Sequence, residues 1–535
     1  MEFKAIFGAS SALCLSAIVL TAQETNQVEQ LKKQLQEIQQ NLEKQRQQME
    51  AVQKQIEALG QKQSATATEQ EKLERTREAK TAEPPPSATT APPIAAGQPW
   101  RPTDPVRFGR GSAYADIGLV ATFAAGGSTA SDIEGGTQLG GHDPNQRGIT
   151  VQGVEMDLRG AVDPYFRGNA NILFSIDGGG ESFLELEEAW LETISLPANL
   201  QVRAGQYLTE FGRINTQHPH AWSFVDTPLV NGRFLGADGL RNPGARLSWL
   251  MPTPFYSELF LGVQNSHGET AASFRSAGHT HGGEGEDAGL PFGFRHPDND
   301  RGVRGVGDLL FTPRLATSFD LTDSQVLLLG ASAAFGPNSS GQSGDTSTHI
   351  YAVDLTLKWK SPRAHAGFPF VMWQTEAMLR RFKAGMFDWD EEGNGGDADG
   401  NTFPDEGVLV DSTGATPAVL NEETLTDYGF YTQLLYGFRK GWVAGLRFDY
   451  VTSGRADYEN AGLLLADNAG GGTPVGRDPL RDMRWRLSPN LTWYPSEFSK
   501  IRLQYNYDDR RDIGVDHSLW LQFEFLLGAH AAHKF

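Results

Sequence analysis

Apolar and polar residues alternate along most of the chain from about residue 112, in segments of roughly ten residues. In one segment Met483, Trp485, Leu487, Leu491 and Trp493 fall on one face of an extended chain, and Arg484, Arg486, Ser488, Asn490 and Thr492 on the other. Similar alternation recurs at 351–359, 442–450, 501–507 and 519–527. Because successive side chains of a strand point to opposite faces, the pattern predicts antiparallel strands with one apolar face and one charged face.

The connections between these segments fall into two kinds. Short turns are expected at 163–164, 196–197, 251–254, 322–323, 439–441 and 495–497, with a longer one at 361–369. Long loops are expected at 125–148, 207–243, 266–305, 336–347, 383–425 and 453–481. Short turns on one side and long loops on the other are typical of a transmembrane barrel. The prediction is therefore all-β: an antiparallel barrel of about 16 strands (range 16–18) over 105–535, preceded by an α-helical coiled coil.

The N-terminal fifth of the chain has a different organisation. Residues 1–22 carry Lys4, an apolar stretch and then Thr21-Ala22, the layout of a secretory signal peptide. The single cysteine, Cys14, lies inside that stretch, so no disulfide is expected. A lipoprotein interpretation of Cys14 is the alternative.

Apolar residues at alternating spacings of three and four follow, from Val28 to Leu59. This heptad pattern predicts a coiled coil within 23–82, which would be periplasmic, and the choice of residues at its seam favours a trimer. A solvated helix without partners is the alternative. Residues 83–104, with Pro84-Pro85-Pro86 and Pro92-Pro93, form a linker that is rich in proline.

Composition supports a barrel and excludes helical membrane transport. The chain of 535 residues has 60 Gly, 30 Phe, a net charge of -20 and only 39% hydrophobic residues, with a mean hydropathy of -0.40. No apolar run reaches the roughly 18 to 20 residues that a spanning helix needs.

The chain ends on Phe535, which resembles the assembly signal of bacterial outer-membrane proteins, although His533 departs from the pattern of that signal.

The order of signal peptide, coiled coil, linker and barrel resembles the phosphate-selective porin O and P family. The segment Val202 to Gly212, which reads VRAGQYLTEFG, carries the resemblance most clearly, together with LEEAWL at 186–191 and the stretch 234–247. The resemblance implies a trimeric diffusion channel in the outer membrane. It does not establish the solute.

Charged residues on the predicted inner faces are candidates to line the channel. They are Arg159, Arg380, Arg447, Arg484, Arg486, Arg502 and Asp449. An anion channel requires a cationic path, whereas residues 388–427 contain twelve acidic residues and no basic one. The charge pattern does not decide whether the channel prefers cations or anions. In the alternative interpretation the same charges only hydrate and cross-link the barrel wall.

The long loop at 207–243 is a candidate constriction. It contains Arg213, His218, His220, Asp226, Arg233 and Arg241, with apolar anchors at Trp222, Phe224 and Phe234. General porins narrow their channel with an inward-folded loop, so we expect this one to set the size limit for solutes. A loop packed on the rim is the alternative.

Two other loops contain possible metal ligands. His279, His281, Glu284 and Glu286 could bind zinc. Asp388, Asp390, Asp397 and Asp399 have part of the spacing of a calcium loop, but Glu392 and the missing terminal glutamate depart from it. Flexible solvated loops are the alternative for both, and no other cofactor is expected.

The function expected from these patterns is a porin for passive diffusion of small hydrophilic solutes or ions. The alternatives are a receptor for metal or metal-complex uptake, and a structural tether between outer membrane and cell wall. The expected partners are two further copies of the chain, joined through the coiled coil and the barrel walls. Outer-membrane lipid and lipopolysaccharide are also expected to contact the chain, and peptidoglycan is a further candidate. The sequence contains no nucleophile motif or basic stripe, so neither an enzyme nor nucleic-acid binding is expected.

Overall fold

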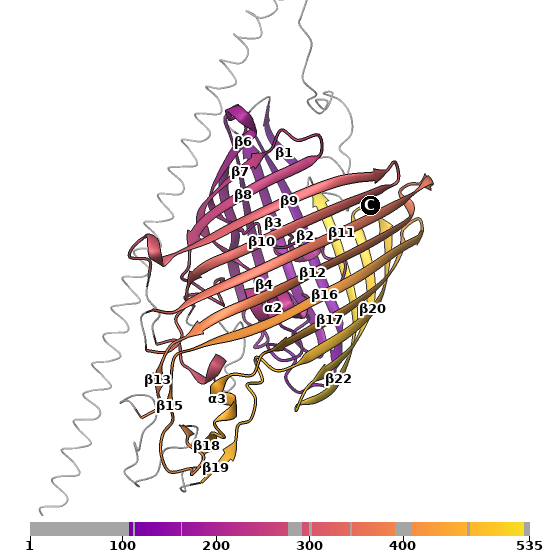
Figure 1. Ribbon diagram of the computed structural model, residues 1–535. Helices are drawn as coiled ribbons and strands as arrows, with labels where there is room; N and C mark the ends of the chain where they lie inside the picture. Colours follow the sequence, from indigo (N-terminus) through magenta and orange to yellow (C-terminus); the bar gives the residue numbers. More distant parts are fainter. Residues whose placement is uncertain are drawn as a thin grey trace, which may run out of the picture. The chain divides into compact units, whose positions relative to one another are not determined.

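The computed structural model describes residues 106–110, 113–161, 163–276, 291–298, 302–342, 345–390, 408–467 and 471–528 (Figure 1). All of these belong to the compact unit Pro99–Phe535. The signal peptide, coiled coil and linker expected at 1–22, 23–82 and 83–104 lie outside the described residues and stay predictions.

Sixteen antiparallel strands close into a barrel. Each strand pairs with its neighbour along the chain, and the last strand returns to the first through the register from Gly118↔Gly528 to Ser128↔Ser518. Closure gives each of the sixteen strands a paired neighbour on both sides. The expected antiparallel barrel and its strand number are confirmed, whereas the coiled coil expected before it lies outside the described residues. The strands are β2 (Ala113–Ser128), β3 (Gly148–Ala161), β4 (Phe166–Ile176), β5 (Ser182–Thr193), β6 (Leu200–Leu208), β7 (Arg241–Leu250), β8 (Tyr256–Asn265), β9 (Leu309–Thr322), β10 (Gln325–Pro337), β11 (Ser347–His365), β12 (Phe368–Ala384), β16 (Glu423–Arg439), β17 (Trp442–Ser453), β20 (Arg484–Ser496), β21 (Ser499–Arg510) and β22 (Gly514–Gly528).

The alternation of residue types determines which side of each strand faces outward. On β21 the outward Leu503 is 46% exposed, whereas the next residue, Gln504, is fully buried in the interior. On β22 Phe523 and Phe525 are exposed and Gln522 and Glu524 are buried. The barrel is therefore apolar outside and polar inside, the reverse of a water-soluble protein. No helix among the described residues is both long and apolar enough to span a membrane.

All six long connections lie at one end of the barrel, together with the short connections 177–181 and 511–513, and the connections at the other end are short. The long ones comprise 129–147, 209–240, 266–308, 338–346, 385–422 and 454–483, while turns such as 440–441 and 497–498 close the other end. One expected turn is wrong: β11 continues to His365, so the turn expected at 361–369 shrinks to 366–367. Ser361 and Pro362 lead us to expect a break there. Instead the strand continues past the regular pairing that ends at Lys360↔Phe370, and after a shift in register His365 pairs with Phe368.

A cap formed by several long connections covers part of the open end. Small sheets join β13 (Phe387–Asp388) to β15 (Val419–Leu420), and β14 (Leu409–Val410) to β18 (Leu464–Ala466) and β19 (Gly472–Pro474). A shared apolar cluster includes Phe294, Trp389, Leu409 and Tyr458, the last on the short helix α3 (Asp457–Asn460). Other short elements are β1 (Val106–Arg110), which pairs with β2, and single 3-10 turns at Pro197–Asn199, Pro219–Ala221, Phe292–Phe294 and Val306–Asp308.

Candidate functional site: the barrel lumen

The connection between β6 and β7, residues 209–240, folds into the barrel, and we call it the in-folded loop. It contains the helix α2 (Leu229–Leu235), which Figure 1 shows within the ring of strands. Its backbone is held by side chains of the wall. The Gly212 N–H donates to Ser332 on β10 (3.1 Å), and the Arg213 N–H to Glu376 on β12 (2.9 Å).

The opposite wall binds the same loop. Strands β20 and β21 donate to three of its carbonyl groups: Asn490 to Ser223 (2.9 Å), Lys500 to His220 (2.6 Å) and Arg502 to Trp222 (2.9 Å). The loop therefore spans from the β10–β12 side to the β20–β21 side. Such a crossing restricts the space open to a solute inside the barrel.

Asp226 is the main electrostatic anchor of the in-folded loop. It is fully buried, and its carboxylate accepts hydrogen bonds from Arg447 Nη2 (2.6 Å) and Arg486 Nη1 (3.0 Å). Gln504 (2.9 Å) and Asn506 (2.8 Å) donate to the same group. Burial by itself would raise the pKa of Asp226, but the two guanidinium groups outweigh it and hold the pKa below the ordinary aspartate value.

Apolar packing anchors the helical part of the loop. Leu229, Val230 and Phe234 of α2 are buried with Met378 of β12 and Val451 of β17 in one cluster. These wall positions face inward and form an apolar area under α2, and a second inward apolar area, with Phe370, Leu435 and Val443, packs against Phe224 of the same loop. The hydrophobic effect fixes the position of the helix, and Asp226 fixes that of the preceding segment.

The residues predicted to line the channel lie on the inner faces of their strands. Six are at most 4% exposed, buried beside the in-folded loop and the neighbouring walls: Arg380 (β12), Arg447 and Asp449 (β17), Arg484 and Arg486 (β20) and Arg502 (β21). Each arginine of this group is hydrogen-bonded, for example Arg380 to Asp427 (2.7 Å) and Arg484 to Asp508 (2.8 Å). Arg159, near the short-turn end, has a side chain that is 46% exposed and pairs with Asp157 (2.7 Å).

The residues predicted for the constriction do not form one cluster. His218 and His220 face glutamates of β3 and β5, at 3.2 Å from Glu188 and 3.0 Å from Glu155. Arg241 is the first residue of β7 and pairs with Glu185. Asp226 reaches β17, β20 and β21, while Arg213 lies at the β12 side. The loop thus distributes its charges around the wall.

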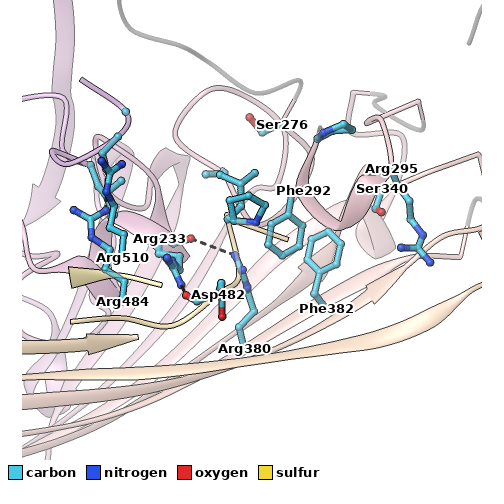
Figure 2. A pocket seen from close by; sticks show the side chains of 18 of the residues that line it. Arg233, Ser276, Phe292, Arg295, Ser340, Arg380, Phe382, Asp482, Arg484 and Arg510 are labelled. Carbon is cyan, nitrogen blue, oxygen red and sulfur yellow. Dashed lines mark hydrogen bonds between the residues drawn. The ribbon is translucent and has the colours of Figure 1, made fainter. Parts of the chain in front are cut away.

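Arg233 lies in a cavity of about 660 Å³ at the long-loop end of the barrel, which we call the vestibule (Figure 2). Its guanidinium donates to the Asp482 carbonyl oxygen (2.7 Å), and it forms no ion pair with a carboxylate of the described residues. Burial, followed by the nearby cations Arg484 and Arg380, lowers the pKa of Arg233 to about 9, so it stays protonated at neutral pH.

The vestibule combines cations with apolar surface. Among its lining residues are the cations Arg233, Arg295, Arg380, Arg484, Arg510 and Arg511 and only the acids Asp132 and Asp482. Apolar side chains cover other parts, and Phe292 packs edge-on against Phe382 with ring centres 5.0 Å apart (Figure 2). A site of this kind can hold an anion against arginine and an apolar body against phenylalanine.

The other candidate metal ligands give no site in the described part of the chain. His279, His281, Glu284 and Glu286 lie outside the described residues, as do Asp397 and Asp399. Asp388 belongs to β13 and accepts a hydrogen bond from the Asp390 N–H (3.0 Å). Zinc or calcium binding by these loops stays a prediction.

Sequence reasoning missed the inward position of two acidic residues of the wall, Glu187 and Glu188, whereas Glu376 is buried inside as its alternation predicts. Glu187 and Glu188 are adjacent in β5, so strict alternation would turn one of them outward, yet both are buried. The pairing with β4 runs from Asn171↔Glu188 directly to Ile172↔Leu186, which leaves Glu187 as an extra residue. A β-bulge of this type redirects a side chain, and consecutive glutamates amid an apolar segment were its only signal.

The chain was compared with protein-family models and with the sequences of known proteins. No protein-family model matches it. An uncharacterised protein of Aquifex aeolicus is 30% identical over 415 residues, which cover 74% of this chain and 73% of that protein.

Several solved structures of outer-membrane proteins align with most of the chain at low similarity. An anion-selective porin of Comamonas acidovorans is 8% identical, covering 78% of this chain and 100% of its own (TM-score 0.43). The outer-membrane channel DcaP of Acinetobacter baumannii is 13% identical, covering 77% and 97% (0.42). OprB of Pseudomonas putida is 13% identical, covering 77% and 94% (0.42). At such scores, function has to be argued from the barrel itself.

Replacing Asp226 by Asn should release the in-folded loop, because it leaves Arg447 and Arg486 buried without their shared carboxylate. Removing one partner of a buried ion pair costs about 3–5 kcal/mol of the free energy of unfolding. Because the pKa of Asp226 is lowered, its stabilisation is present above the ordinary aspartate pKa of about 4 and is lost as the pH falls through the native value. Hydrogen exchange should accelerate at the amides of Val225 and Leu229, which bond to Gln504 and Asp449.

The matched control is Asp512→Asn, in the exposed turn between β21 and β22, where the backbone has a φ of 65° that Asn tolerates. This variant should change stability by less than about 0.5 kcal/mol. Unchanged exchange at Val225 in Asp226→Asn would show that the carboxylate does not anchor the loop.

Proposed function

We propose that this chain, which belongs to the same family as the uncharacterised protein of Aquifex aeolicus, forms a channel for passive diffusion of small hydrophilic solutes across a bacterial outer membrane. One observation carries the proposal. A closed barrel of sixteen strands is apolar outside and charged inside, and an in-folded loop crosses its interior. A lipid environment accounts for the outer face, and a hydrated passage accounts for the inner one.

The outer face has the surface that a bilayer requires. Large apolar side chains are exposed along the strands, including Leu491 on β20, Leu503 on β21 and Phe523 on β22. Near the short turns the exposed side chains include many aromatic ones, and Trp442 stacks on Trp493 with ring centres 5.8 Å apart. Aromatic girdles occupy the membrane–water interface of such barrels. Exposed members of this girdle are Tyr165, Phe166, Phe255, Tyr256, Tyr436, Phe438 and Trp493.

The inner geometry supports selection by size and charge. The in-folded loop restricts the lumen, so we propose that it sets the size limit. The vestibule supports a preference for anions, because cationic side chains outnumber acids there and Arg233 has no carboxylate partner among the described residues. Its phenylalanine surface favours a small organic anion over inorganic phosphate. Phosphate selectivity, implied by the family resemblance, therefore has less support than organic-anion transport.

Assembly and other roles are proposed on the sequence alone. The heptads at 28–59 support a homotrimer with its coiled coil in the periplasm. Lipopolysaccharide and peptidoglycan contacts, and a tether role for 23–104, rest on the same N-terminal pattern and the acidic loop. Energised uptake receptors are typically barrels of about 22 strands with a separate plug domain. A barrel of sixteen strands that is crossed by an internal loop therefore fits the receptor alternative poorly.

Membrane insertion should depend on the outer face of β22. Leu521→Arg places a cation at the middle of the strand and should destabilise the barrel in lipid by about 2–4 kcal/mol. The control Val515→Arg makes the same kind of change near the long-loop end of the same strand, where the cost is about 0–1 kcal/mol. The measurement is the free energy of unfolding in phospholipid vesicles. Equal effects of the two substitutions would contradict a membrane-facing β22.

Ion selectivity should depend on Arg233. In a planar bilayer with a salt gradient, the wild type should give a reversal potential of the sign for anions, and Arg233→Gln should shift it toward zero. The control Arg381→Gln removes the same charge one residue beyond Arg380, from an exposed position on the outer face of β12. A cation-selective wild type, or equal shifts in both variants, would refute the proposed role of the vestibule; absence of any conductance would refute the channel.

A further inference from the structure

A buried cluster of three histidines and three glutamates lies on the lumen wall, apart from the vestibule. We call it the histidine–glutamate cluster. Four elements supply it: the connection 129–147, β3, β5 and the in-folded loop. Its members are His142, Glu155, Glu187, Glu188, His218 and His220.

Three side chains of this cluster direct ligand atoms toward one point. Atoms of Glu155, Glu187 and His218 lie within 4.8 Å of one another. His218 Nδ1 is 3.4 Å from Glu187 Oε2 and 3.6 Å from Glu155 Oε2. Ligand atoms at the zinc distances of about 2.0–2.2 Å, arranged tetrahedrally, are separated by about 3.3–3.6 Å. The two separations from His218 Nδ1 match this geometry, and the third, between Glu155 and Glu187, is within 4.8 Å.

Two of these atoms have no hydrogen bond. His218 Nδ1 and Glu187 Oε2 are both buried, and the contact between them lacks hydrogen-bond geometry. The Glu187 side chain is only 4% exposed, so water does not solvate its charge freely. A buried carboxylate oxygen and an imidazole nitrogen that face each other without a hydrogen bond are costly unless a cation joins them.

The surrounding residues have the arrangement found around metal ligands. Glu188 lies 3.2 Å from His218 Nε2 and can accept its proton, which would leave the lone pair of Nδ1 directed at Glu155 and Glu187. His142 Nε2 is 3.2 Å from Glu187 Oε1, the oxygen that does not face His218. His220 Nδ1 is 3.0 Å from Glu155 Oε2, the same oxygen that faces His218. Each ligand is thus oriented by a neighbour.

A small cavity adjoins two of the three proposed ligands, Glu187 and His218. His142 also lines it, and its volume is about 40 Å³. This is enough for a water molecule, which could complete a fourth coordination position. Two carboxylates and one imidazole are a donor set suited to a borderline divalent ion, whereas a hard ion such as calcium takes oxygen ligands alone.

We propose that Glu155, Glu187 and His218 bind a divalent transition-metal ion, for which Zn²⁺ is the probe, and that Glu188 positions His218 for it. The ion would join β3 and β5 to the in-folded loop and so fix the loop at a point remote from Asp226. The proposal concerns metal binding and is independent of channel activity.

The competing arrangement is an imidazolium at His218 that is shared by the glutamates. Isothermal titration of ZnCl₂ into the purified full-length protein in detergent, after removal of metal with a chelator, separates the two at neutral pH. The wild type should bind about one equivalent. His218→Gln and Glu187→Gln should weaken binding at least about tenfold, and Glu188→Gln by about 10–100-fold, as for other residues that orient a ligand.

Two controls make the result specific. The double variant His279→Gln/His281→Gln removes the histidines of the other candidate loop and should bind Zn²⁺ like the wild type. Titration of Co²⁺ should give the visible absorption of a four-coordinate ion in that variant and in the wild type, but not in His218→Gln. Circular dichroism and heat stability identify any variant that fails to fold, and Glu188→Gln, which keeps all three ligands, then supplies the test.

The proposal is overturned if the folded wild type binds no Zn²⁺. It is also overturned if binding disappears in His279→Gln/His281→Gln but persists in His218→Gln. Bilayer conductance can fail without affecting either result, so the outcome for the metal site and that for the proposed channel are distinguishable.

Discussion

The buried carboxylate of Asp226 couples the in-folded loop to the barrel. It receives two guanidinium groups, from β17 and β20, and two amides from β21. Each of the two arginines also pairs with a wall carboxylate, Arg447 with Asp449 and Arg486 with Asp508, so Asp226 adds a second carboxylate to both. Wall and loop each depend on the other, because removing either leaves buried charge with fewer partners.

The same requirement for compensation organises the rest of the lumen. A barrel in lipid has to direct its polar residues inward, where charges are acceptable only when paired or hydrated. Most inner arginines pair with acids of the wall, as Arg380 does with Asp427. Arg233 in the vestibule has no such partner among the described residues, and in the histidine–glutamate cluster His218 Nδ1 and Glu187 Oε2 face each other at 3.4 Å without a hydrogen bond. The vestibule and the histidine–glutamate cluster are therefore the two places of the interior that we propose to bind a ligand.

Much of the fold could be predicted from the sequence because strand alternation is a local property. Leu503 and Gln504 reveal their faces by residue type, and turn residues such as Lys440 and Gly441 mark the ends of strands. The position of Glu187 could not be predicted, since it depends on a bulge in the pairing with β4. The partners of Asp226 are more than 200 residues away in the sequence, and nothing local indicates which inner arginines a loop will meet. The cluster around His218 depends on both effects together.

The central claim is that an in-folded loop, held by Asp226, narrows a diffusion channel. Single-channel conductance in planar bilayers, compared between the wild type and Asp226→Asn, tests it most directly. The account predicts discrete open steps for the wild type, and larger or more variable steps for the variant as the loop leaves the lumen. Identical step sizes in the two proteins, with Asp226→Asn shown to be folded and inserted, would contradict it.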